Sequence, residues 1–90
     1  MGIAAVRITI MPLSPDSNLK EIEDNAKELI EKEEGMIMNF KEEPIAFGLK
    51  SIIVSFEWPE EKELDEIEAK IGKINEVKSA EVTDIRRAIG

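Results

Sequence analysis

Two arginines near the end of the chain are the side chains best suited to act on a charged ligand. Arg86 and Arg87 are the only adjacent cations in a sequence with 20 acidic and 12 basic residues. A guanidinium group stays charged at any physiological pH and can bind phosphate or carboxylate oxygens. The alternative interpretation is that the pair only protects or solubilises the edge of a terminal strand. The residues alone leave both interpretations open.

Phe47 is the second candidate, because aromatic residues make up only 4% of the chain. It lies in the segment Glu-Pro-Ile-Ala-Phe-Gly, between Pro44 and Gly48. Pro44 restricts the backbone, whereas Gly48 can adopt conformations that a Cβ atom would forbid. One interpretation is that a stiffened loop presents the ring to a partner. The other is that the ring fastens the loop to the core, which is the more common arrangement for a phenylalanine.

The composition argues against most enzymatic chemistry. The chain has no cysteine and no histidine, so it lacks the commonest transition-metal ligand and the usual proton carrier at neutral pH. The acidic pairs Glu33–Glu34 and Glu42–Glu43 are adjacent rather than opposed across a pocket, so general acid–base catalysis is a poor expectation. The scattered glycines form no phosphate-binding loop of the G-x-x-x-x-G-K type. We therefore expect no enzyme, no catalytic residue, no metal and no cofactor.

Length and charge limit the possible partners. Ninety residues are enough for one small domain, and we expect residues 1–90 to form a single unit. A net charge of -8 repels nucleic acid and anionic membrane surfaces, so a direct contact with either is not expected. The apolar residues near the start carry Arg7 and lack the pattern of a signal peptide, and no run is long enough to span a membrane. These features predict a cytoplasmic protein.

Hydrophobic periodicity predicts four strands and two helices. The predicted strands are 3–11, 36–41, 49–58 and 77–87, and the predicted helices are 18–33 and 60–75. The strand at 49–58 has the clearest alternation, with one apolar face formed by Ile52, Val54, Phe56 and Trp58. Residues from Glu42 onward are expected to form a loop before it.

The boundaries of the first helix and of the strand after it follow from local signals. Ser17 or Asn18 is the expected N-cap, and Gly35 is expected to end the first helix. In the next strand, Met36, Met38 and Phe40 should alternate with Ile37, Asn39 and Lys41. Acidic residues crowd the start of the second helix, where the helix dipole favours them.

The order strand, helix, strand, strand, helix, strand predicts an α+β fold. In a chain of this length it is typical of the ferredoxin-like sandwich, βαββαβ, with a four-stranded antiparallel sheet in the order 4-1-3-2 and both helices on one face. This fold hosts unrelated functions and so names none by itself. One function class that it allows is a ligand-sensing or oligomer-forming module that uses the open face of the sheet.

Two motifs together resemble archaeal translation elongation factor 1-beta. They are Glu-Pro-Ile-Ala-Phe-Gly-Leu-Lys at 43–50 and Val-Lys-Ser-Ala-Glu-Val-Thr-Asp-Ile-Arg-Arg at 77–87, and the likeness extends to the Met-Pro step at 11–12. That family is similar to the C-terminal domain of the eukaryotic factor. The resemblance implies guanine nucleotide exchange on elongation factor 1-alpha during protein synthesis, by a monomer that needs no cofactor.

The resemblance also assigns roles to the candidate residues. It implies that Phe47 contacts the GTPase and that a terminal basic residue, Arg87 or its neighbour Arg86, reaches toward the magnesium and phosphate site of that partner. In a 4-1-3-2 sheet, the start of the third strand and the end of the fourth lie at opposite ends. We therefore expect Phe47 and Arg87 to be separated by roughly 30 Å.

Overall fold

Two central strands carry the core of the protein. The computed structural model describes residues 2–87, in which β1 (Ile3–Pro12) pairs antiparallel with β3 (Lys50–Pro59). Alternate side chains of both strands point toward the helices, as the period-two pattern predicts. They are all buried: Ala4, Val6, Ile8, Ile10, Ile52, Val54, Phe56 and Trp58. The predicted apolar face of the third strand is therefore confirmed.

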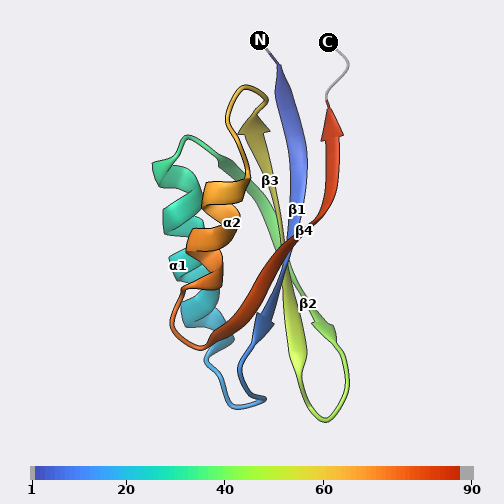
Figure 1. Ribbon diagram of the computed structural model, residues 1–90. Coiled ribbons are helices and arrows are strands. Elements are labelled where there is room, and N and C mark those ends of the chain that lie inside the picture. Colours follow the sequence, from blue (N-terminus) through green and yellow to red (C-terminus); the bar gives the residue numbers. More distant parts are fainter. Residues whose placement is uncertain (1, 88–90) are drawn as a thin grey trace.

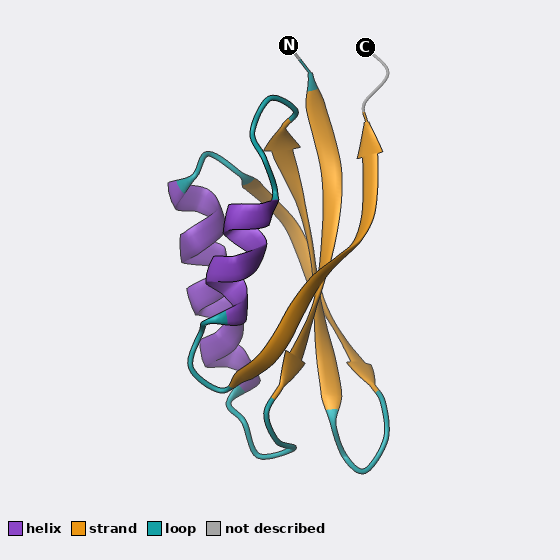
Figure 2. Ribbon diagram, viewed as in Figure 1, coloured by secondary structure: helices purple, strands orange, loops and turns teal. Residues whose placement is uncertain are grey.

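The two outer strands complete an antiparallel sheet in the order β2-β3-β1-β4. β2 (Met36–Pro44) pairs with β3, and β4 (Val77–Arg87) pairs with β1. Both helices lie on one face of this sheet and leave the other face open (Figure 1; Figure 2). The predicted ferredoxin-like sandwich and its 4-1-3-2 order are confirmed, because the observed strand order is the predicted one counted from the opposite edge of the sheet.

Helix α1 (Leu19–Lys32) begins where the sequence predicts. The Asn18 side chain accepts a hydrogen bond from the Glu21 backbone N–H at 3.1 Å and so caps the helix. Its C-terminus differs from the prediction, because the positive φ of 73° falls on Glu34 and not on Gly35. Gly35 has a different role: a Cβ there would lie 2.5 Å from Cγ2 of Ile30. The same Cβ would lie 3.0 Å from Cε3 of Trp58 on β3, so the glycine is needed where the end of α1 closely approaches the sheet.

Helix α2 (Asp65–Gly72) is shorter than the predicted 60–75. The residues before it form a turn, in which the Lys62 N–H donates to the Pro59 carbonyl at 3.1 Å. Trp58 Nε1 donates to the Lys62 carbonyl at 3.2 Å, and Lys62 Nζ donates to the Glu33 carbonyl at 2.7 Å. These hydrogen bonds hold the segment out of helical geometry, so the prediction for 60–64 is wrong. The prediction for 73–75 is wrong as well, because α2 ends at Gly72 and turns follow it before β4.

Irregular pairing changes the predicted alternation of β2. The register shifts between Ile37 and Asn39, so Met38 is an extra residue opposite β3. As a result Ile37 and Phe40 both pack against the core, whereas Met36 and Met38 are exposed. The predicted grouping of Met36, Met38 and Phe40 on one face is wrong for this reason. β4 has two similar shifts, which leave Thr83 and Lys78 as its extra residues.

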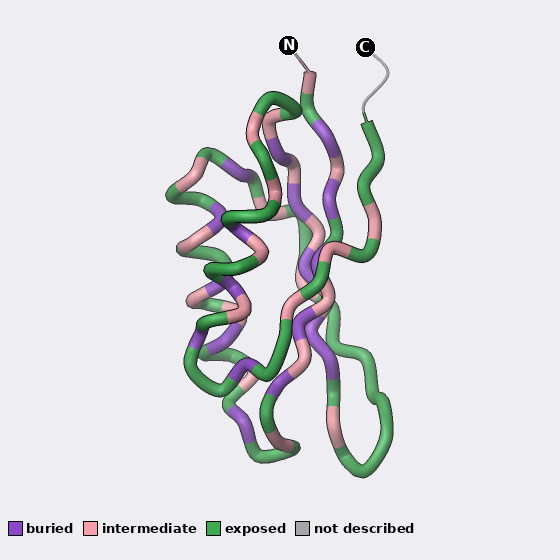
Figure 3. Tube along the Cα trace, in the orientation of Figure 1, coloured by how far each residue is buried: buried purple, intermediate pink, exposed green. Residues whose placement is uncertain are grey.

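Burial follows the two layers, with the buried residues concentrated between the helices and the sheet (Figure 3). Neither helix in the described part of the chain is long and apolar enough to cross a membrane.

Candidate functional site

The β2–β3 connection is a tight turn that projects from one end of the sheet (Figure 1). β2 continues through Pro44, which pairs with Lys50, so the loop is shorter than the predicted one starting at Glu42. The Ile45 N–H donates to the Leu49 carbonyl at 2.8 Å, and the Leu49 N–H donates to the Ala46 carbonyl at 3.0 Å. These two hydrogen bonds fix the backbone on either side of Phe47.

Phe47 lies at the tip of this turn and is 95% exposed. Its φ is 56° and that of Gly48 is 79°, so both central residues of the turn have left-handed backbone. Turns with two positive φ values normally place Asn, Asp or Gly at both positions. A phenylalanine there costs about 1 to 2 kcal/mol relative to glycine. The interpretation that Phe47 fastens the loop to the core is wrong, since the ring points away from the protein at an energetic cost.

A second loop passes close to the turn at Gly48. A Cβ on Gly48 would lie 3.7 Å from Cβ of Pro15, in ordinary van der Waals contact. The Pro15 loop is fixed to the start of β4, since the Leu13 N–H donates to the Glu76 carbonyl at 2.8 Å and Ser17 Oγ donates to Glu76 Oε1 at 3.0 Å. The backbone at Gly48 therefore lies near an anchored loop.

Arg86 and Arg87 lie at the end of β4 and point to opposite faces of the sheet. In the β1–β4 ladder Arg87 pairs with Ala4 and Arg86 pairs with Ala5. Because Ala4 is on the buried, helix-facing side, Arg87 belongs to that side and Arg86 to the open side. Both residues are exposed, since the strand end extends beyond the helices.

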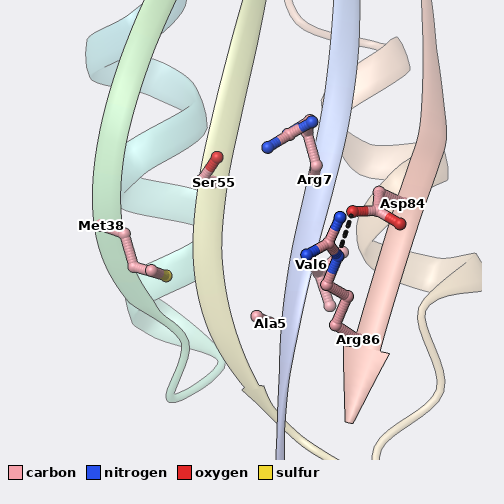
Figure 4. A pocket seen from close by; sticks show the side chains of 7 residues that line it. All are labelled: Ala5, Val6, Arg7, Met38, Ser55, Asp84 and Arg86. Atoms are coloured by element: carbon pink, nitrogen blue, oxygen red, sulfur yellow. Dashed lines mark hydrogen bonds and ion pairs between the residues drawn. The ribbon is translucent and has the colours of Figure 1, made fainter. Parts of the chain in front are cut away.

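The two arginines also differ in their partners. Arg86 Nε donates to Asp84 Oδ2 at 3.1 Å, which holds its guanidinium over the open face (Figure 4). Among the residues described, the Arg87 side chain makes no ion pair or hydrogen bond. Arg86 is thus held in place, whereas Arg87 is available at the end of the strand.

The open face beside Arg86 has a shallow pocket of about 140 Å³ (Figure 4). Its lining comes from all four strands: Ala5, Val6, Arg7, Met38, Ser55, Asp84 and Arg86. Arg7 is not among the predicted site residues. In the sequence, Arg7 is the single charged residue of the alternating strand 3–11. That position indicates only that this face of the strand is exposed to solvent.

Phe47 and the arginines lie at opposite ends of the molecule, as Figure 1 shows. Ala4 pairs with both Arg87 and Trp58, whereas Phe47 lies beyond the other end of β3, at Lys50. Eight residues of strand at about 3.3 Å each, plus the turn, give roughly 30 Å. The long axis of the molecule is 42 Å. The structure thus separates the predicted site residues into two locations, as expected.

Neither location has the features of a catalytic or metal centre. Within residues 2–87 no group of three or more Asp or Glu side chains is arranged to hold a metal ion. Among residues 2–87, partial burial and the nearby Glu42 carboxylate raise the pKa of Glu23 on α1, which is not one of the predicted site residues. What the site offers is therefore an exposed ring and fixed positive charges, which suit protein recognition.

Comparison with known proteins gives a consistent result. A family model described as the EF-1 guanine nucleotide exchange domain matches residues 5–88. Elongation factor 1-beta of Methanocaldococcus jannaschii is 35% identical over 89 residues, which cover 98% of this chain and 100% of that protein. Elongation factor 1-beta of Methanosarcina barkeri is 36% identical over 88 residues, covering 97% and 99%.

A solved structure supports the fold alone. The ACT domain from GTP pyrophosphokinase of Chlorobium tepidum superposes with a TM-score of 0.62 at 16% identity, covering 88% of this chain and 96% of that one. Identity this low carries no information on function.

Proposed function

The chain belongs to the family of EF-1 guanine nucleotide exchange domains, and we propose that it acts on its GTPase through two separated contacts, Phe47 at one end and Arg87 at the other. Its function is the exchange of GDP for GTP on elongation factor 1-alpha in translation. The observation that carries the two-contact proposal is the exposed, left-handed Phe47 at the opposite end from the arginines.

Arg87 is assigned to the nucleotide site of the GTPase. Bound GDP is held by magnesium and by contacts to its phosphates, so a cation inserted at the metal position competes for the same negative charges. Metal release then weakens the hold on GDP, and the nucleotide leaves. The mechanism shifts a binding equilibrium and forms or breaks no covalent bond in this chain. The domain therefore acts as a binding partner without a cofactor and not as an enzyme.

The difference between the two arginines favours Arg87 for this role. Arg86 is already engaged by Asp84, so to reach a phosphate it would have to give up that ion pair. Arg87 is exposed at the end of the strand, with its backbone fixed by pairing to Ala4. Because the strand is already paired, only the side chain of this cation has to be ordered when it enters a partner.

Phe47 is assigned to docking. A turn that holds left-handed backbone at a phenylalanine presents the ring before the partner arrives, which lowers the cost of ordering it on binding. Exposed aromatic side chains are frequent energetic anchors in protein interfaces. A separation of roughly 30 Å between the contacts would allow the domain to span two parts of the GTPase.

The remaining features follow from the same proposal. We expect residues 1–90 to act as one domain, as a monomer in the cytoplasm, without contact to nucleic acid or membrane. The alternative, a ligand-sensing or oligomer-forming module, would use the open face of the sheet. The depressions there have volumes of about 140 and 190 Å³. Pockets for small ligands are usually at least about 300 Å³, which favours the exchange function.

The direct test is the release of fluorescent GDP from purified elongation factor 1-alpha, measured with and without this chain. We expect acceleration at micromolar concentration, and a decrease of that acceleration as magnesium is raised, because the metal competes with Arg87. No acceleration would contradict the function, and acceleration independent of magnesium would contradict the proposed role of Arg87.

A further inference from the structure

The pocket on the open face contains two of the three arginines of this acidic protein. The chain has three arginines, all of them in β1 or β4, and two of these, Arg7 and Arg86, line the same 140 Å³ depression. All of its other cations are lysines. A guanidinium binds carboxylate oxygens with two parallel N–H donors, which a lysine cannot do. The pocket is therefore equipped for an oxyanion rather than for a generic negative surface.

The charges in the pocket do not cancel. Asp84 is the only carboxylate in the lining, and it pairs with Arg86 at 3.1 Å. Arg7 pairs with Asp84 in the strand register, but its guanidinium turns the other way, toward Ser55 on β3 (Figure 4). Within residues 2–87 the Arg7 side chain has no ion-pair partner. One positive charge and the Ser55 hydroxyl are thus left to bind an incoming group.

The floor of the pocket suits the stem of an acidic side chain. Ala5 lies opposite Arg86 in the β1–β4 ladder, and the exposed Met38, at the bulge of β2, forms an apolar wall. Methylene groups can pack on these atoms while a carboxylate reaches the Arg7 guanidinium. The limited volume excludes a drug-sized ligand but accommodates a single side chain.

We propose that this pocket receives an aspartate or glutamate side chain of elongation factor 1-alpha and so orients the domain on the GTPase. The inference rests on the proposed function, since it deepens the contact made at the β4 end. The pocket is continuous with that end: Arg86 is next to Arg87 along β4 and faces the opposite side. In a domain of net charge -8, an acidic partner group is repelled at most positions and attracted here, which fixes the orientation of docking.

Arg7 provides the cleanest test, because it has no part in the proposed exchange step. The affinity of Arg7→Glu for nucleotide-free elongation factor 1-alpha is measured by calorimetry and compared with that of Lys27→Glu, which makes the same charge change at an exposed position on α1. We expect Arg7→Glu to weaken binding by about tenfold or more and Lys27→Glu by less than about twofold. At saturating concentration, Arg7→Glu should accelerate GDP release as the unmodified chain does.

Further variants separate this proposal from its alternatives. Arg7→Lys should recover only part of the affinity, since it restores the charge but not the paired donors. Arg7→Gln repeats the test without charge reversal, and thermal unfolding confirms that each variant is folded. Equal binding by Arg7→Glu, Arg7→Gln and the Lys27→Glu control would overturn the proposal. If the unmodified chain binds the GTPase but does not accelerate GDP release, the proposed function is wrong. The Arg7 comparison still decides whether the pocket binds an acidic side chain of the GTPase.

Discussion

At one end of the sheet the exposed group is an aromatic ring on a two-residue turn, whereas at the other end it is a pair of guanidinium groups on a paired strand. Phe47 is held by its own backbone conformation, with φ of 56°. Arg86 and Arg87 are held by the β1–β4 ladder, which directs them to opposite faces. In each case the backbone is fixed. The Phe47 and Arg87 side chains are exposed, whereas the Arg86 side chain is also held by Asp84. We expect the Phe47 end to contribute most of the affinity for the GTPase and the arginine end to promote release of GDP.

The largest effect should come from removing the charge at the strand end. Arg87→Ala should slow GDP release at saturating concentration by roughly 100-fold, the scale of loss when one well-placed charge is removed from a site. Affinity for the GTPase should change little, because the docking surface remains. Arg87→Lys should retain most of the activity. Stopped-flow release of fluorescent GDP at several domain concentrations separates the two quantities.

Arg86→Ala is the matched variant for that experiment. It should weaken binding through the open-face pocket and leave the saturating rate near normal. The reverse result, with Arg86→Ala slow and Arg87→Ala unaffected, would exchange the roles of the two arginines. Normal rates for both single variants and the double variant would contradict the cation mechanism altogether.

The next largest effect concerns Phe47, whose removal should lower the affinity for the GTPase but not the stability of the fold. Phe47→Ala should cost about 2 kcal/mol or more of binding free energy, roughly 30-fold in Kd. Because the ring makes no core contact, the free energy of unfolding should change by only about 0.5 kcal/mol. Calorimetric binding and thermal unfolding measure the two. A loss of stability of about 3 to 5 kcal/mol, as for a buried phenylalanine, would show that the ring is structural.

A smaller effect tests whether backbone conformation supports the turn. Gly48→Ala should destabilise the fold by about 1 to 2 kcal/mol, since alanine is disfavoured at a φ of 79°. The new methyl group itself has room, at 3.7 Å from Cβ of Pro15, so the cost would come from the backbone. Chemical denaturation measures it. Unchanged stability would mean that the left-handed turn is not required.

The smallest effect provides a control at a residue outside the predicted site. The pKa of Glu23 is raised by partial burial and by Glu42, so its ionised form costs stability at neutral pH. Glu23→Gln should therefore stabilise the fold slightly at pH 7, within about 0.5 kcal/mol. The gain should disappear as the pH falls below the ordinary range for a glutamate, where the unmodified residue is protonated in both states. Exchange activity should not change, and an altered rate would place α1 within the interface.

The sequence predicts the sheet well because its central strands obey a simple rule. β1 and β3 bury every second residue, and the same period of two is visible in the order of the amino acids at Ile52, Val54 and Phe56. The start of α1 is equally local, since Asn18 and Glu21 form the cap between themselves. Where the local sequence signals and the tertiary packing favour the same structure, the sequence alone predicts that structure.

The predictions fail where a distant contact decides the local structure. The early start predicted for α2 overlooks the hydrogen bond from Lys62 to Glu33, 29 residues away, which no periodicity reveals. The bulge at Met38 regroups β2 in the same way, because it depends on pairing with β3. At the site, the family motifs identify Phe47, Arg86 and Arg87. Arg7 becomes a candidate only in the structure, where it lines the same pocket as Arg86.

The pairing of Ala4 with Arg87 has a consequence for how the domain assembles. The β2–β3 hairpin can form from neighbouring residues at small loop-closure cost, so the Phe47 turn depends on local contacts. The β1–β4 pairing joins segments separated by almost the whole described chain, and contacts of such high sequence separation form slowly. The ring can therefore be presented early in folding, while the arginines reach their positions only when the last strand has docked. A partly folded chain would have the means to hold the GTPase before it has the means to release the nucleotide.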